Sequence, residues 1–140
     1  MNRSRRPPFA DCPCESGQPY AQCCGVWHAA WRTGPYAPDP QALMRSRYSA
    51  YVLGLTDYLL ATWHPGTAPG ELDLAPLKWL GLEVCRSEAS TDAGVVEFVA
   101  RYRENGRGVR LHEISRFVRE GERWLYVDGQ QLPPEKTEAG

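Results

Sequence analysis

Four cysteines in one short segment near the N-terminus offer the clearest chemistry of this 140-residue chain. Cys12 and Cys14 are one residue apart, and Cys23 and Cys24 are adjacent after a loop of eight residues. Two close pairs of thiols joined by a short loop can converge on one tetrahedral ion, and thiolate sulfur is a preferred ligand of zinc. The spacing therefore predicts a closed zinc site with four thiolate ligands, which we call the cysteine knuckle.

Disulfide bonds, an iron site or a redox role are the alternatives for these cysteines. Cysteines that are adjacent or one residue apart bridge each other only with strain, so disulfides would have to cross between the two pairs. The arginines of residues 1–8 are followed by no apolar stretch, so no export to an oxidising compartment is predicted. Zinc is the favoured interpretation, and His28, four residues after Cys24, is a reserve ligand.

The cysteine segment resembles the SEC-C motif, the small zinc module at the C-terminus of the translocase motor SecA. Gly17 and Tyr20 stand where that motif has a glycine turn and an aromatic residue. The SecA module docks the chaperone SecB, so the resemblance implies a protein partner, chaperone- or secretion-related, for this chain. We assign the module to residues 1–32, including a flexible basic N-terminus.

Net charge and hydropathy narrow the class of protein. The formal net charge is −1 at pH 7, which gives no overall attraction to phosphate, so a nucleic-acid partner is not expected. No run of 18 apolar residues could span a membrane, and a cytoplasmic location is expected. Arginines beside the knuckle would compensate its negative charge, with a nucleic-acid or ribosome contact as the alternative: Arg3, Arg5 and Arg6.

Helical periodicity follows a linker rich in proline and glycine. Asp39 is a good N-cap before Pro40, and apolar residues at three- and four-residue steps predict helices over 41–53 and 57–63. Gly54 is the predicted break, and Thr56 or Asp57 the predicted cap of the second helix. A short helical piece is also expected to hold Leu74, Leu77 and Trp79.

The pattern then changes to a period of two, which is typical of strands. Four strands are predicted, at 82–89, 95–103, 109–119 and 123–128, with Asn105-Gly106-Arg107-Gly108 as a hairpin turn. Helices followed by an antiparallel meander predict an α+β domain over residues 38–132, with helices wrapped on one face of a curved four-stranded sheet. Residues 133–140 are expected to be a disordered tail.

The register of the last hairpin would decide which side chains face the helices. A two-residue loop at Glu120-Gly121 would place Glu113 opposite Asp128 and Ser115 opposite Tyr126. These side chains could line a small-molecule pocket together with residues from the helices: Tyr51, Trp63 and His64. The carboxylates would then need a cation or a raised pKa, and Arg45 and Arg47 are the expected partners.

Structural roles are favoured over catalysis for this set. His64 at a helix end is expected to cap carbonyl groups rather than act as a base. Cys85, in the first strand, is expected to be a small buried side chain, whereas His112 should face outward. The outer sheet face could pair with a second copy of the chain through its apolar residues: Ile114, Val118, Leu125 and Val127.

Separated motifs over residues 9–132 resemble the uncharacterised bacterial YchJ-type family. They include the cysteine segment, residues 43–48 (LMRSRY), residues 62–65 (TWHP), residues 79–82 (WLGL), residues 98–102 (FVARY) and residues 124–129 (WLYVDG). The resemblance implies a nuclear-transport-factor-like fold and zinc at Cys12, Cys14, Cys23 and Cys24, but no known reaction. The expected function is a zinc-binding interaction protein that is not an enzyme; the alternative is ligand binding or enzyme activity in the sheet cavity.

Overall fold

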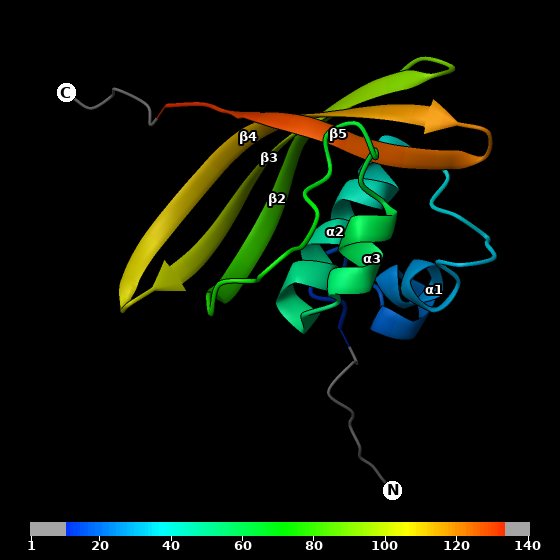
Figure 1. Cartoon of the computed structure of the whole chain (residues 1–140). Coiled ribbons are helices and arrows are strands. Elements are labelled where there is room, and N and C mark those ends of the chain that lie inside the picture. The colour runs from blue at the N-terminus through cyan, green and yellow to red at the C-terminus, as the bar shows by residue number, and fades with distance from the viewer. Residues whose placement is uncertain (1–10, 134–140) are drawn as a thin grey trace, which may run out of the picture.

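The computed structural model describes residues 11–133 and has the predicted α+β architecture. A short 3-10 turn, η1 (Tyr20–Gln22), precedes the helices α1 (Cys24–Ala29), α2 (Pro40–Leu53) and α3 (Thr56–Ala61). Four antiparallel strands follow in spatial order: β2 (Lys78–Ala89), β3 (Ala93–Glu104), β4 (Arg107–Glu120) and β5 (Arg123–Gln131). The sheet arches over α2, with α3 beside it (Figure 1). The predicted basic N-terminus (1–10) and the tail from 134 to 140 lie outside the described residues.

Helix α2 begins and ends where local chemistry predicts. The Asp39 carboxylate accepts a hydrogen bond from the Ala42 amide at 2.8 Å, and Gly54 ends the helix with a φ of +75°. The predicted cap of α3 is wrong, because Leu55 precedes that helix and no side chain caps it. The predicted helical piece around Trp79 is also wrong, since Trp79 belongs to β2.

Two-residue turns join β3 to β4 and β4 to β5. Asn105 and Gly106 both have positive φ, as the first turn requires, and Glu104 pairs with Arg107. The second turn is Gly121-Glu122 rather than Glu120-Gly121, because Gly121 occupies its first central position with a φ of +65°. The predicted pairing is therefore shifted by two residues, and Phe117 lies opposite Tyr126.

A β-bulge in β5 corrects the predicted faces of the sheet. Val127 is an extra residue between the pairs Phe117–Tyr126 and Arg116–Asp128. A bulge turns the following side chain to the other face. Asp128 therefore lies on the outer face beside Arg116, and the predicted pairing of Glu113 with Asp128 is wrong, since Glu113 pairs with Gln131.

The hydrophobic core joins the cysteine segment to the sheet. Leu43 and Met44 of α2 pack in one buried cluster with Cys12, Cys14 and Cys24 and with apolar residues of the sheet: Leu82, Val96, Phe98, Ala100, Phe117 and Trp124. A second cluster links Ala50 of α2 to Tyr58 and Leu59 of α3. Helix α2 thus packs against both the knuckle and the sheet. None of the helices described between residues 11 and 133 is long and apolar enough to cross a membrane.

Candidate metal centre and sheet cavity

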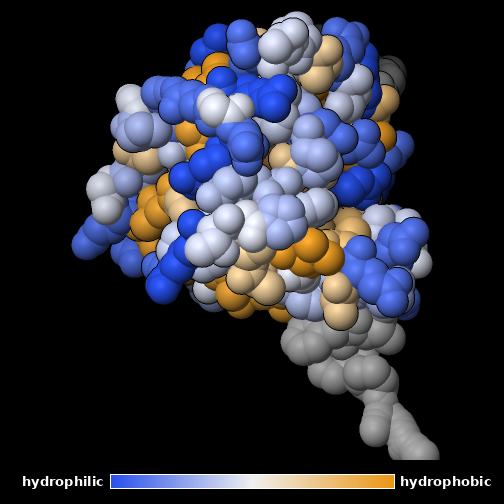
Figure 2. All heavy atoms as spheres, turned by 90° about the vertical axis from the view of Figure 1, so that its right-hand side faces the viewer, coloured by the Kyte–Doolittle hydropathy of each residue, from blue (hydrophilic) through white to orange (hydrophobic). Residues whose placement is uncertain are grey.

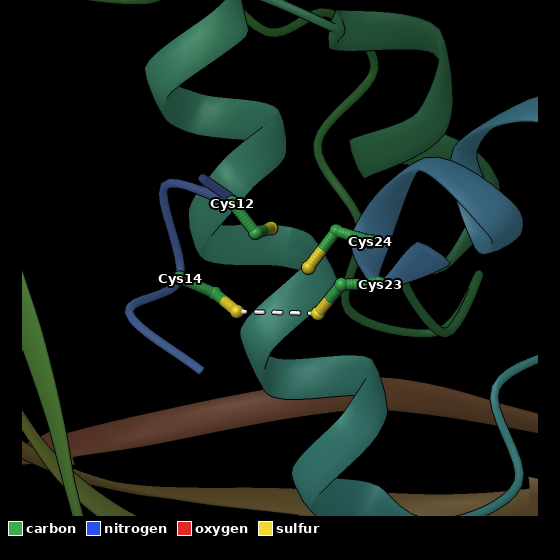
Figure 3. Close-up of side chains that lie close together, drawn as sticks. All are labelled: Cys12, Cys14, Cys23 and Cys24. Atoms are coloured by element: carbon green, nitrogen blue, oxygen red, sulfur yellow. Dashed lines mark hydrogen bonds between the residues drawn. The ribbon is translucent and has the colours of Figure 1, made fainter. Parts of the chain in front are cut away.

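The four cysteines of the knuckle converge, as the sequence predicts. Their sulfur atoms all lie within 4.8 Å of one another, so the group could hold a metal ion. Cys12 and Cys14 come from the loop before η1, while Cys23 is the N-cap and Cys24 the first residue of α1 (Figure 3). All four are free thiols, and the Cys14 and Cys23 sulfurs are 3.6 Å apart.

Local backbone conformation brings the two cysteine pairs together. The Cys12 amide donates to the Gln18 carbonyl at 2.9 Å, which closes the loop, and the Glu15 amide donates to the Cys12 carbonyl at 3.1 Å. Glu15 and Gly17 have φ values of +64° and +87°, so the chain turns sharply between the pairs. Gly17 therefore occupies the glycine turn that the SEC-C resemblance predicts.

Helix α2 supports the knuckle from behind. Arg45 donates through Nη1 to the Cys14 carbonyl at 2.7 Å, and the Ser49 hydroxyl lies 3.6 Å from the Cys12 sulfur. The Ser16 hydroxyl lies 3.1 Å from the Cys23 sulfur. Hydroxyl groups at these positions can donate to thiolate sulfur. Outer contacts of this kind orient metal ligands.

The electrostatics of the knuckle call for a cation. Hydrogen bonds from Cys12 and then from Cys24 lower the pKa of the Cys14 thiol, whereas the hydrogen bond to Cys12 raises the pKa of Cys24. Burial raises the pKa of Cys23. Neighbouring acids disfavour each other's ionisation, so four thiolates can coexist here only if a positive ion compensates them.

His28 is not available as the reserve metal ligand. Its Nε2 lies 2.8 Å from the Ser46 carbonyl oxygen, to which it can only donate, and its Nδ1 then accepts from the Tyr20 hydroxyl at 2.6 Å. Burial lowers the pKa of His28, in keeping with a neutral ring. Both nitrogens are therefore engaged, and the chemistry rests on the four sulfurs.

A second candidate site lies between α2 and the concave face of the sheet. This cavity has a volume of about 150 Å³, and most of its wall is apolar or aromatic. The predicted Tyr51, Glu113, Ser115 and Tyr126 all line it, together with Arg47 and further residues of the helix and sheet: Met44, Tyr48, Trp79, Phe98, Ala100, Leu111 and Phe117. The predicted Trp63, His64 and Asp128 are not among the lining residues.

Asp128 and His64 have partners elsewhere. Asp128 forms a two-pronged ion pair with Arg116 on the outer face, with distances of 2.7 and 2.6 Å. His64 lies beside the edge of β5, where its Nε2 is 2.9 Å from the Glu120 carboxylate and its Nδ1 accepts from the Gly66 amide. The prediction that His64 caps a carbonyl group is therefore wrong.

Glu113 is the acid of the cavity, and Ser115 donates to its carboxylate at 2.8 Å. Burial raises the pKa of Glu113. The hydrogen bond from Ser115 and the charge of Arg47 lower this pKa, but they only partly offset the effect of burial. The raised pKa was predicted, although from repulsion by Asp128, which is the smallest of the causes. Gly129 lies opposite Ser115, and a Cβ there would collide with the Glu113 carboxylate.

Arg47 is the cation of the cavity and is only 5% exposed. It donates to the Leu59 carbonyl and to the Thr62 hydroxyl, both at 2.8 Å, and its guanidinium lies over the Trp63 and Tyr126 rings. None of the ion pairs found among residues 11–133 includes Arg47. Arg45, the other predicted partner of Glu113, points to the knuckle instead.

The wall that α2 contributes could have been found from the sequence. Met44, Arg47, Tyr48 and Tyr51 recur at three- and four-residue steps, which places them on one helix face. Because Arg47 belongs to this helix face, the face provides a cavity wall with a charged group rather than a purely apolar wall. The sequence does not show that Arg47 is buried, because its burial depends on contact with the Trp63 and Tyr126 rings.

Comparison with known proteins agrees with both parts of this arrangement. Residues 10–25 match the SEC-C motif, and residues 39–129 match the family described as YchJ, middle NTF2-like domain. The fold and the cysteine site thus define a SEC-C motif protein with an NTF2-like domain. Because the second match covers more than half of the chain, the chain belongs to the YchJ-type family.

Relatives and solved structures cover nearly the whole chain. A UPF0225 protein from Bordetella parapertussis is 54% identical over 130 residues, which cover 89% of this chain and 97% of the relative. A UPF0225 protein from Polaromonas naphthalenivorans is 60% identical over 117 residues, covering 81% and 83% of the two chains. The solution structure of a SEC-C motif containing protein from Rhodopseudomonas palustris superposes with a TM-score of 0.75 at 35% identity and covers 88% and 99%.

Proposed function

We propose that this chain is a zinc-binding protein whose SEC-C module docks a protein partner in the cytoplasm. The observation that carries the proposal is the convergence of four free cysteines within 4.8 Å, three of them buried. Sulfur is a preferred zinc ligand, and four protein ligands leave no open position for substrate. Zinc held in this way has a structural role, in which it orders the knuckle.

Metal analysis of the purified chain tests the zinc assignment. After dialysis against a mild chelator, we expect a single zinc ion to remain per chain, because a closed tetrathiolate site holds zinc tightly. Cys14→Ser should lose this zinc, while the matched variant Cys85→Ser should keep it. Equal zinc content in Cys14→Ser and the unchanged chain would contradict the assignment.

The surface of α1 beside the knuckle supports the docking proposal. Hydrophobic residues gather at the lower edge of the face that carries α1 and the β4–β5 turn, while its upper part is mostly hydrophilic (Figure 2). Val26 and Trp27, both in α1, are half-buried. Apolar surface that a rigid module leaves accessible suits a protein partner. The SEC-C resemblance favours a chaperone- or secretion-related one.

Paired baits separate metal-dependent docking from simple folding. Val26→Glu places a charge on the half-buried face of α1 and should leave the four cysteines in place. A partner that uses this face should be captured by the unchanged chain, lost with Cys14→Ser, and lost with Val26→Glu although that variant retains its zinc. Capture that both variants leave unchanged would overturn the docking proposal.

Binding of a small anion in the cavity is the second candidate function. It is favoured by Arg47, a buried guanidinium in the cavity wall that has no carboxylate within ion-pair distance among residues 11–133. A carboxylate ligand would supply that missing charge. Small carboxylic acids should then raise the melting temperature of the unchanged chain and do so less in Ser115→Ala. No shift with any small acid would argue against this function.

Self-association through the outer sheet face is a further proposal about partners. Leu125 is only 6% exposed, so the half-buried Ile114, Val118 and Val127 would supply most of the apolar surface. Val118→Glu should then convert a dimer to a monomer in sedimentation analysis. A monomeric unchanged chain would end this proposal.

A further inference from the structure

Cys85, Glu97 and His112 meet on the outer face of the sheet, far along the chain from the knuckle. A sulfur, a carboxylate oxygen and a ring nitrogen of these three side chains lie within 4.8 Å of one another. Cys85 belongs to β2, Glu97 to β3 and His112 to β4. Cys85 is exposed, which corrects the expectation that it is a small buried side chain.

A β-bulge brings the cysteine into this group. Val84 pairs with Phe98 and Arg86 pairs with Glu97, so Cys85 is an extra residue in β2. Regular alternation would place consecutive side chains on opposite faces. The bulge instead lets both Cys85 and Arg86 reach Glu97, since the Cys85 sulfur and the Arg86 guanidinium both approach its carboxylate. Bulges are frequent beside functional sites, where they re-aim a side chain.

The two oxygens of Glu97 have separate roles in this group. Oε1 lies 3.4 Å from Arg86 Nε, whereas Oε2 lies 2.7 Å from His112 Nε2. Arg86 is itself held by Glu88 at 2.9 Å. One carboxylate oxygen is thus oriented from outside, and the other is directed at the imidazole, as in the outer contacts that orient metal ligands.

We propose that Cys85, Glu97 and His112 form a second metal site, which binds a divalent transition-metal ion of the zinc class. The donor set of one sulfur, one nitrogen and one oxygen suits such an ion, and three protein ligands leave a fourth position for water. Ligand atoms around tetrahedral zinc are about 3.3–3.8 Å apart. Side-chain rotations that move the three ligand atoms by about 1 Å therefore complete the site. The metal takes the place of the hydrogen bond between His112 Nε2 and Glu97 Oε2.

This second site is expected to bind metal more weakly than the knuckle. It has three ligands instead of four, it is open to solvent, and the positive charge of Arg86 lies beside it. The two sites are independent, because their residues lie on different elements. Failure of the zinc proposal for the knuckle would therefore leave this inference standing, and the reverse also holds.

Cobalt titration of the full chain that keeps a single zinc ion after dialysis against a mild chelator tests the inference. Co²⁺ reports a thiolate ligand by a sulfur-to-metal charge-transfer band, and the unchanged chain should bind a further equivalent with such a band. Cys85→Ser should abolish that band. Glu97→Gln and His112→Gln should weaken binding at least about tenfold, since even outer contacts of metal ligands are worth about 10- to 100-fold in affinity.

Matched controls make the outcome decisive. Glu104→Gln removes an exposed carboxylate from the same strand as Glu97 and should leave the titration unchanged. Cobalt that enters the knuckle instead gives a band that Cys85→Ser retains. Absence of a further equivalent, or a Cys85→Ser variant with unchanged affinity and band, would overturn the inference.

Discussion

The knuckle and the sheet cavity differ in the charge that each one lacks. In the knuckle, four acidic sulfurs lie within 4.8 Å of one another, and no side-chain cation completes them among the contacts described. In the cavity, the Arg47 guanidinium is buried, and the nearby acid, Glu113, has a raised pKa. The proposed occupants therefore have opposite charge, a metal cation in the knuckle and a small anion in the cavity. Both sites contact α2, the knuckle through Arg45 and Ser49 and the cavity through Arg47.

Removal of metal from the knuckle should cause the largest change in stability. With a chelator or Cys14→Ser, amide exchange in α1 should accelerate about a thousandfold, corresponding to about 4 kcal/mol of local stability, the scale of losing a structural metal. The sheet should keep its protection, because its ladders do not depend on the knuckle. Exchange in α1 that is indifferent to chelation would show that the knuckle folds without metal, and Cys85→Ser is the control.

Removal of the buried Arg47 cation should cause the second-largest loss of stability. Arg47→Met removes hydrogen bonds to the Leu59 carbonyl and the Thr62 hydroxyl, and it removes a cation that lies over two aromatic rings. We expect the free energy of unfolding to fall by about 3 kcal/mol, measured by urea denaturation. Arg101→Met, at an exposed position of β3, should cost less than about 0.5 kcal/mol. Equal effects of the two substitutions would refute a structural role for the buried charge.

A crowded contact at the edge of the cavity predicts a smaller change. Gly129→Ala puts a methyl group where the Glu113 side chain lies, so that side chain must move at a cost of about 1–3 kcal/mol. In the double variant Glu113→Ala/Gly129→Ala the collision is gone, and the two costs should not add. Additive losses in unfolding free energy would mean that the two residues do not touch.

The smallest effect concerns the pH dependence of Glu113. Burial raises its pKa in the folded protein above the ordinary value of 4.5, so the folded state binds this proton more tightly than the unfolded state. The stabilisation is therefore complete below pH 4.5 and is lost as pH rises through the folded pKa. Glu113→Gln should gain stability relative to the unchanged chain over that rise, by less than about 1 kcal/mol. A difference in melting temperature that stays constant with pH would contradict this.

Local signals explain what the sequence could predict. The Asp39 cap, Pro40, the Gly54 stop and the Asn105-Gly106 turn act over a few residues, so the boundaries of α2 and the first hairpin follow from them. The cysteine spacing likewise predicts the convergence of the knuckle, because its loop is short.

Bulges explain most of what the sequence could not predict. Counting pairs back from a turn assumes strict alternation, and one extra residue, Val127, moves Asp128 out of the predicted cavity. The extra residue Cys85 brings a thiol to Glu97 and His112 on three different strands. Neither bulge has a glycine or proline that marks it in the sequence, since both depend on how neighbouring strands pack.

Helix α2 holds both sites by residues only two positions apart. Arg45 donates to the Cys14 carbonyl of the knuckle, whereas Arg47 faces the cavity. A displacement of this helix therefore changes both the knuckle and the cavity. Binding at the two sites is then coupled, and the coupling is reciprocal. Any cavity ligand that prefers the metal-loaded position of α2 must raise the metal affinity of the knuckle by the same factor by which metal raises the affinity for that ligand.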